Sequence, residues 1–236
     1  MDITAYKTFA KDKLHVVFDD ADLLLTAFTH RSYLNEHKKT VKQHNERLEF
    51  LGDAVLELVV TEYLYQTYPD PEGILTNWRS SLVRTESISA AATKFGFEPL
   101  LRLSRGEKRG SARARAQILA NSFEAVVGAL YIDQGYEAAK HFIADSILST
   151  FEDILASGSW MDAKSHLQEL AQSQETATPV YKVMQEAGPD HDKTFTVGVL
   201  VNDKLRGQGT GPSKQSAQQQ AAEAALDYYQ QTEAKA

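Results

Sequence analysis

Acidic side chains recur at helical spacing in the segment Asn45–Leu56. Glu46, Glu49 and Asp53 stand at positions i, i+3 and i+7 of this segment. Because each residue of an α-helix turns by about 100°, the three carboxylates fall on one stripe of a helix. Like charges on one stripe repel one another, so the stripe destabilises the helix unless cations occupy it. A solvated helix face is the commoner origin of such a stripe, and both interpretations stay open at this point.

A second acid, Glu124, lies in a segment of small apolar residues, Ile118–Leu130. An ionised carboxylate in such surroundings is unfavourable without a partner, although a helix-surface acid is the alternative. Asn121 precedes Glu124 by three residues and therefore shares its helix face. A cation bound jointly with Glu49 and Asp53 would supply the partner. The small residues that would let the two helices approach closely are Ala125, Gly128 and Ala129.

The amino-acid composition restricts the chemistry of a metal site. The chain contains no cysteine, so thiolate ligands and disulfides are excluded. Carboxylate and amide oxygens suit Mg²⁺, with Mn²⁺ able to substitute. Such ions activate water and polarise phosphate, as hydrolysis of a phosphodiester requires. We therefore predict a metal cluster built from Glu49, Asp53, Asn121 and Glu124.

The charge distribution and the hydropathy of the chain limit which binding partners are possible. The chain of 236 residues has a net charge of −7, but six basic residues and one acid occupy the segment Arg102–Arg115. This segment also contains glycines, and we expect a mobile loop that is either simply solvated or faces a phosphate backbone. The N-terminus does not resemble a secretory signal, and no apolar stretch approaches the ~20 residues that span a bilayer. We expect a cytoplasmic protein without a membrane partner.

The periodicity of apolar residues changes near residue 156. Before it, spacings of three and four predict helices over 22–29, 46–68, 75–95, 116–133 and 136–155. After it, the patterns predict a helix over 162–173, strands over 180–186, 194–201 and 204–208, and a glycine-rich turn over 207–212. Ser213 is then predicted to be the N-cap of a helix that runs to about Tyr229. We predict an all-α domain over residues 1–156, a linker over 157–161, and a small α+β domain (α-β-β-β-α) over 162–231.

Residues 45–56 (NERLEFLGDAVL) closely resemble the signature helix of bacterial ribonuclease III. Residues 29–33 (THRSY), 103–107 (LSRGE) and 123–125 (FEA) agree with that family in order and spacing. The C-terminal region resembles a double-stranded-RNA-binding domain, so the resemblance covers about residues 5 to 230. It implies an all-α ribonuclease III endonuclease domain followed by a small α+β RNA-binding domain.

The resemblance implies an endoribonuclease that cleaves double-stranded RNA by Mg²⁺-dependent hydrolysis and leaves 5′-phosphate and 3′-hydroxyl ends. It also implies a homodimer that holds the duplex and a role in processing ribosomal and messenger RNA, and we expect no small-molecule cofactor. Asp53 and Glu124 match the family's catalytic carboxylates. Glu46 matches an acid near the cleavage site, and Glu72 matches an acid near the partner subunit's site.

The resemblance further implies where RNA binds. The first helix of the second domain would meet one minor groove, and the loop over 188–191 would reach the next. The beginning of the last helix would meet phosphates. The residues implied to bind RNA, together with one from the basic segment, are Gln168, Glu169, His191, Ser213, Lys214 and Arg105.

This chain departs from the family pattern at two places. Asn121 stands where many members have aspartate, and an amide oxygen coordinates a cation without adding negative charge, so we expect weaker metal affinity. In the second domain, Gln215 and Gln218 stand where positive charge is common, and residues 160–236 contain seven basic and ten acidic residues. We therefore expect weak RNA binding with a shallow salt dependence.

Two alternatives remain at this stage. The chain could be a non-catalytic double-stranded-RNA-binding protein on the same fold, which the retention of Glu49, Asp53 and Glu124 disfavours. It could also be a metal-dependent hydrolase of small nucleotides, which would not need a C-terminal RNA-binding domain.

Overall fold

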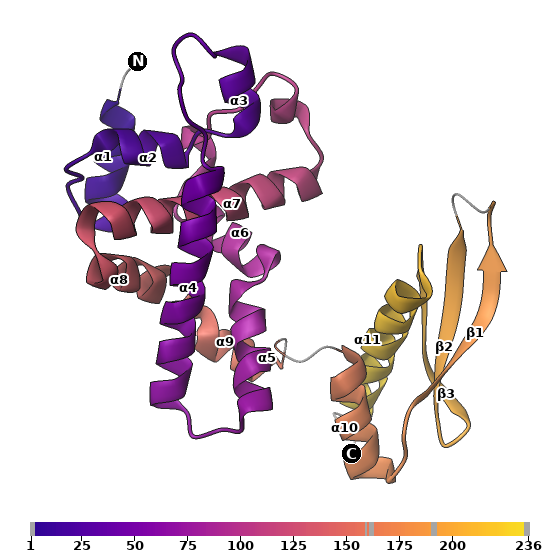
Figure 1. Ribbon diagram of the computed structural model, residues 1–236. Helices are drawn as coiled ribbons and strands as arrows, with labels where there is room; N and C mark the ends of the chain where they lie inside the picture. The colour runs from indigo at the N-terminus through magenta and orange to yellow at the C-terminus, as the bar shows by residue number, and fades with distance from the viewer. Residues whose placement is uncertain (1–2, 159, 161–162, 190–192, 234–236) are drawn as a thin grey trace. The chain divides into compact units, whose positions relative to one another are not determined.

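The chain folds into two compact units, Met1–Trp160 and Met161–Ala236. The computed structural model describes residues 3–158, 160, 163–189 and 193–233 (Figure 1). Unit 1 is mainly helical and unit 2 combines two helices with a three-stranded sheet, so the predicted fold class is confirmed. The predicted linker over 157–161 stays a prediction. Within the described ranges, no helix is long and apolar enough to cross a membrane.

Unit 1 is built from a succession of α-helices. They are α1 (Thr4–Phe9), α2 (Ala21–Ala27), α3 (Arg31–Glu36), α4 (Glu46–Thr67), α5 (Glu72–Val83), α6 (Thr85–Lys94), α7 (Ala112–Gln134), α8 (Tyr136–Ser146) and α9 (Phe151–Ser157). A π-helical turn, Ala10–Leu14, continues α1. The sequence patterns did not predict α1 or α3, which are only six residues long.

Two of the predicted helices are each divided in the structure. The segment 75–95 consists of α5 and α6, because Arg84 adopts an extended conformation with ψ 153°. The segment 136–155 consists of α8 and α9, separated by a 3-10 turn, Leu148–Thr150. Apolar spacing continues across both breaks because the helices on either side face the same core. Periodicity therefore reports the buried face and misses a bend in the backbone.

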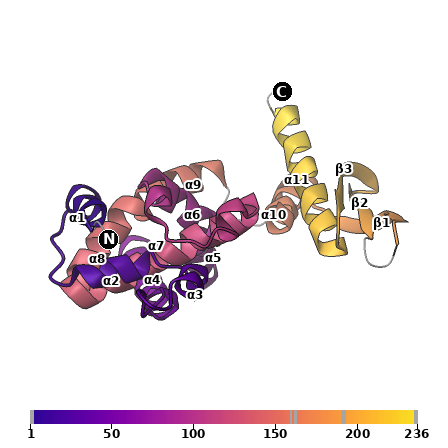
Figure 2. The same cartoon turned by 90° about the horizontal axis from the view of Figure 1, so that it is seen from above.

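Helix α7 is the central helix of unit 1, and it contacts α2, α4, α6 and α8 (Figure 2). Its closest approach is to α4. A Cβ atom added to Gly52 would lie 1.7 Å from the backbone oxygen of Glu124, and one added to Gly128 would lie 2.3 Å from the backbone oxygen of Leu48. The prediction that Gly128 allows a close approach is therefore confirmed, and Gly52 on α4 is its counterpart. Since neither position has room for a side chain, the backbones of α4 and α7 touch.

Unit 2 contains α10 (Ala163–Glu175), the strands β1 (Val180–Ala187), β2 (Thr194–Val201) and β3 (Lys204–Gly211), and α11 (Lys214–Glu233). The strands are antiparallel in the order β1-β2-β3. The core of this unit joins Leu167 of α10 and Val197 and Val199 of β2 to the alanines of α11. The helices thus cover one face of the sheet.

The glycine-rich segment predicted as a turn over 207–212 is instead the second half of β3, so this prediction was wrong. Gly207, Gly209 and Gly211 all face α11, where an added Cβ would come within 2.3 to 2.7 Å of Ala221 or Ser216. These glycines are placed at every second position because α11 packs directly on the strand backbone. Glycine here serves close packing rather than a change of chain direction.

Gly52→Ala should destabilise unit 1. The added methyl group must displace the backbone of α7, and such overpacking costs about 1–3 kcal/mol, which lowers the unfolding midpoint by several degrees. Fluorescence measures this change specifically, because the two tryptophans, Trp78 and Trp160, are both in unit 1. Gly73→Ala on α5 is the matched control, since an added Cβ there has no neighbour within 4 Å. Equal midpoints for the two variants would contradict the close contact.

Candidate active site

The contact between α4 and α7 brings the predicted acids together. Glu49, Asn121 and Glu124 are half-buried where the two helices touch, and Asp53 is exposed beside them. Between residues 122 and 130 of α7, Glu124 alone is not fully buried. The charges of Asp53 and Glu49 both act on the Glu124 carboxyl. The carboxylates predicted from two separate segments therefore form one cluster.

The cluster favours protonation of Glu124. Burial raises the pKa of the Glu124 carboxyl to about 8, and the nearby charges of Asp53 and Glu49 act in the same direction. Burial and the charge of Glu46 also raise the pKa of Glu49, while a hydrogen bond from Asn121 opposes this shift. Like charges in a partly desolvated place favour the neutral acid. Both charges that act on Glu124 are negative.

The Asn121 side chain is held between two neighbours. Gln117, one helical turn earlier on α7, donates from Nε2 to Asn121 Oδ1 at 2.7 Å. Asn121 also hydrogen-bonds Glu49, and because an ionised carboxylate only accepts, the amide nitrogen must be the donor. In this arrangement Asn121 stabilises Glu49 and its oxygen is engaged by Gln117. Gln117 was not predicted from the sequence, although its i, i+4 spacing to Asn121 was a usable signal.

The donor set fits a hard divalent cation. Glu49, Asp53, Asn121 and Glu124 offer only oxygen ligands, which suit Mg²⁺ and Mn²⁺. The raised pKa of Glu124 marks a place where a cation would relieve repulsion. Among the side chains that the structure describes, no three acids or histidines are gathered closely enough to enclose an ion. Ionised carboxylates without a cation repel one another, and the predicted metal cluster stays a prediction.

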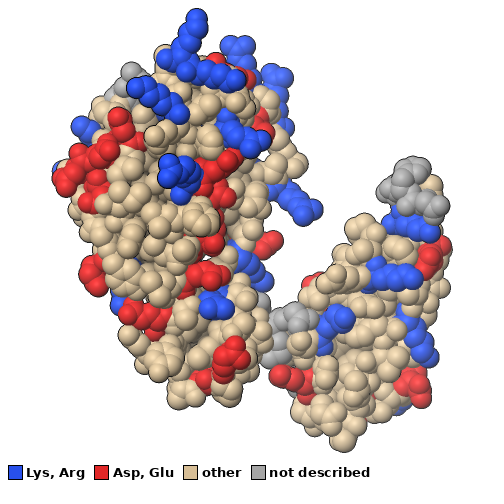
Figure 3. Space-filling view, in the orientation of Figure 1, with Lys and Arg blue, Asp and Glu red and all other residues tan. Residues whose placement is uncertain are grey.

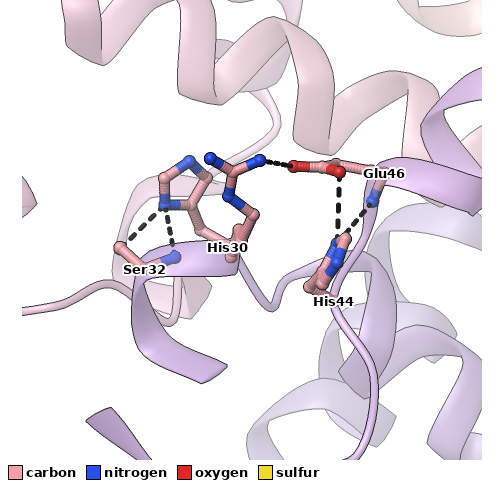
Figure 4. Close-up of polar contacts among 5 residues, drawn as sticks. His30, Ser32, His44 and Glu46 are labelled. Atoms are coloured by element: carbon pink, nitrogen blue, oxygen red, sulfur yellow. Dashed lines mark hydrogen bonds and ion pairs between the residues drawn. The ribbon is translucent and has the colours of Figure 1, made fainter. Parts of the chain in front are cut away.

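Glu46 lies at the beginning of α4 and faces basic side chains rather than Glu124. Figure 4 shows its carboxylate between His44 and a guanidinium group, with His30 and Ser32 alongside. The guanidinium of Arg31 is 3.5 Å from Glu46 Oε1, and Nδ1 of His44 is 3.8 Å from Oε2. His30 Nδ1 contacts the Ser32 hydroxyl at 2.8 Å and accepts from the Ser32 backbone N–H. Glu46 thus connects the acidic cluster to the α3 region.

Glu72 is not brought to the acidic cluster within one chain. It begins α5, beyond the far end of the 22-residue helix α4, which at 1.5 Å per residue is roughly 30 Å long. There it lines a cavity of about 640 Å³ together with Thr61, Tyr65 and Arg79. A role for Glu72 near the acids therefore requires a second chain.

The basic segment Arg102–Arg115 is partly structural. Arg102 is buried, donates to Thr29 Oγ1 at 2.9 Å and lies 4.5 Å over the Tyr33 ring. Arg115 lies 3.5 Å from Glu98. Between Arg102 and Arg115 the chain contains a hydrogen-bonded 3-10 turn, Glu107–Arg109, rather than forming an entirely open loop. The basic residues of this segment that are exposed are Arg105, Lys108, Arg109 and Arg113.

These exposed cations lie at one end of unit 1. Figure 3 shows Lys and Arg side chains gathered at the end that carries α3 and the segment before α7. Backbone hydrogen bonds hold this end together, because Thr29 accepts from Asn45 and His30 donates to Arg102. The basic segment is therefore joined to the beginning of the acidic helix α4 through Thr29 and His30. A polyanion bound to this end would lie next to the carboxylates.

The polar residues predicted to bind RNA on unit 2 are on its surface. Gln168 and Glu169 are exposed on α10, and Ser213 and Lys214 are exposed at the beginning of α11. Ser213 caps α11 by accepting from the Ser216 backbone N–H at 3.1 Å, as the sequence predicts. His191 lies outside the described residues.

The fold and the site define a class of protein: a nuclease-like helical unit with a carboxylate cluster, followed by an α-β-β-β-α unit with exposed polar side chains on its helices. A family model described as ribonuclease-III-like matches residues 20–151, and one described as double-stranded RNA binding motif matches residues 163–229. The chain belongs to the ribonuclease III family and is an endoribonuclease of double-stranded RNA.

Similar proteins agree with this assignment. Ribonuclease 3 of Enterococcus faecalis is 46% identical over 93% of this chain and 95% of its own length. Ribonuclease 3 of Desulforamulus reducens is 43% identical over 92% of this chain and 89% of its own length. The crystal structure of the nuclease domain of ribonuclease III from Campylobacter jejuni is 35% identical, with a TM-score of 0.54, and covers 61% of this chain and 94% of that domain.

The metal-free protein should lose stability as pH rises. The Glu124 carboxyl has a pKa of about 8 in the folded chain against an ordinary value of 4.5, so the folded state holds a proton that the unfolded state releases in this window. In EDTA, the unfolding midpoint should fall by a few degrees between about pH 5 and about pH 8. Glu124→Gln should weaken this dependence, because glutamine does not titrate. Parallel curves for the two proteins would mean that Glu124 is not the group responsible.

Proposed function

We propose that this chain cleaves double-stranded RNA by Mg²⁺-dependent phosphodiester hydrolysis, with Mn²⁺ able to substitute, and leaves 5′-phosphate and 3′-hydroxyl ends. We also propose a role in processing ribosomal and messenger RNA. The observation that carries the chemistry is the cluster of Glu124 with Asp53 and Glu49, in which burial and like charge raise the pKa of Glu124 to about 8. The cytoplasmic location expected from the sequence stays a prediction.

The residues of the cluster have separate tasks in this proposal. A bound divalent cation supplies an activated water and stabilises charge on the phosphate. Asp53 and Glu124, from two different helices, would hold such an ion at the contact between α4 and α7. Glu49 is the third carboxylate of the cluster, and its hydrogen bond with Asn121 keeps it in place. Glu124 must lose its proton to bind a cation, so ion binding and deprotonation are coupled.

The exposed cations and the second unit supply binding. Arg105 and its basic neighbours are exposed in the segment that Thr29 and His30 join to the beginning of α4, and there they would contact phosphates. Gln168, Glu169, Ser213 and Lys214 would contact the duplex through unit 2. A match to the double-stranded RNA binding motif over residues 163–229 supports duplex RNA over small nucleotides as the substrate. Retention of the three carboxylates favours an enzyme over a purely RNA-binding protein.

Glu124→Gln should abolish cleavage of a long duplex RNA in Mg²⁺ while leaving RNA binding within about threefold of the parent chain. Glutamine keeps the shape of the protonated acid but removes the negative charge that would hold a cation. Glu57→Gln is the control, because Glu57 is an exposed acid further along α4. The measurement is gel analysis of end-labelled duplex RNA with and without Mg²⁺, beside single-stranded RNA. Cleavage by Glu124→Gln would exclude Glu124 from the site.

We further propose that the chain acts as a homodimer built on α4. Phe50, Leu58 and Tyr65 are 82%, 57% and 79% exposed and are spaced by eight and seven residues, so they share one face of the helix. An apolar stripe of this size on a long helix is typical of an interface. A solved nuclease domain of ribonuclease III from Campylobacter jejuni shows structural flexibility in a region involved in dimer formation. In such a dimer, Glu72 of the partner subunit would lie near the acidic cluster, which Glu72 of the same chain does not reach.

Phe50→Asp should convert the dimer to a monomer. A buried, unpaired carboxylate within an apolar interface is strongly unfavourable. Sedimentation velocity at micromolar concentration should give the mass of two chains for the parent protein and about one for the variant. Val17→Asp is the control, since Val17 is 77% exposed but lies outside the α4 stripe. A parent protein that sediments as a monomer, or an unchanged mass for Phe50→Asp, would contradict this interface.

A further inference from the structure

Lys214, the first residue of α11, is already engaged by an acid of its own unit. Its Nζ atom lies 3.1 Å from Glu186 Oε1 of β1 and 5.4 Å from the centre of the Phe195 ring. The sheet register produces this contact, because Glu186 pairs with Phe195 and Phe195 pairs with Gly211, which leads into α11. The ion pair therefore follows from the fold of the sheet.

Another anion can replace Glu186 as the partner of Lys214. The side chains of Lys214 and Glu186 are 57% and 43% exposed, and solvent-exposed pairs contribute only about 0–1 kcal/mol. A phosphate and a carboxylate both bind an ammonium group through charged oxygens. An incoming phosphate could thus replace Glu186 on Lys214, but the displaced carboxylate would remain close to the phosphate and repel it.

We propose that Glu186 occupies the place of a nucleic-acid phosphate on Lys214 and lowers the affinity of unit 2 for duplex RNA. This inference rests on the proposed function, in which Lys214 contacts RNA. In this proposal Glu186 limits the strength of RNA binding. RNA must break the Glu186–Lys214 pair before Lys214 neutralises a phosphate. The effect adds to the acidic balance of residues 160–236, which contain seven basic and ten acidic residues.

Glu186→Gln tests this directly in the full chain. Binding to a fluorescently labelled duplex RNA is measured by anisotropy in EDTA, so that no cleavage occurs, over a range of salt concentrations. Removing the carboxylate should tighten binding about three- to tenfold at low salt. It should also make the slope of log affinity against log salt steeper by about one phosphate contact. Lys214→Gln in the Glu186→Gln background should remove this gain.

Asp203→Asn is the matched control, because it changes the net charge by the same amount. Asp203 lies in the turn between β2 and β3 with a φ of 58°, a conformation that asparagine also adopts. This variant should change the affinity less than twofold and leave the salt slope unchanged. Equal gains for Glu186→Gln and Asp203→Asn, or a gain that survives Lys214→Gln, would overturn the inference.

The same experiment separates this inference from the proposed function. A parent chain that cleaves duplex RNA in Mg²⁺, with an affinity that does not respond to Glu186→Gln, refutes only the role of Glu186. A parent chain that neither binds nor cleaves duplex RNA refutes both. Circular dichroism of each variant before binding confirms that unit 2 keeps its fold.

Discussion

The backbone contact between α4 and α7 is the constraint on which the candidate active site depends. Gly52 and Gly128 leave no room for side chains, so the two helices meet at the level of Glu124. This contact places acids from distant parts of the sequence in one partly desolvated cluster. The carboxylates of that cluster repel one another, but the folded unit tolerates this repulsion because its large apolar core stabilises it. Packing thus imposes the repulsion that a bound cation would relieve.

The basic side chains and the carboxylate cluster of unit 1 occupy different places, so the residues proposed to bind RNA are separate from those proposed to hold a metal ion. The exposed cations of the segment Arg102–Arg115 are joined to the beginning of α4 through Thr29 and His30, while Arg102 serves the fold. In unit 2 the acids outnumber the bases, and Lys214 is held by Glu186. With weak electrostatic attraction, contacts that follow the shape of the A-form duplex would carry a larger share of recognition.

Local patterns in the sequence predicted most of the elements but not their breaks. The limits of β2 and the first residue of α4 agree with the apolar patterns, since those segments bury one consistent face. The same patterns predicted single helices over 75–95 and 136–155, because a bend at Arg84 or near Ile147 leaves the apolar spacing intact. The glycines of β3 resembled a turn until their contacts with α11 were known.

The sequence by itself determined that Glu46, Glu49 and Asp53 share a helix stripe, that Glu124 lies in an apolar segment, and that the chain resembles ribonuclease III. These properties depend on order and spacing along the chain. Only the tertiary structure decided that burial raises the pKa of Glu124, that Gln117 engages Asn121, and that Glu186 reaches Lys214. Desolvation and side-chain pairing depend on distances between atoms, and those distances exist only once the helices and strands are packed.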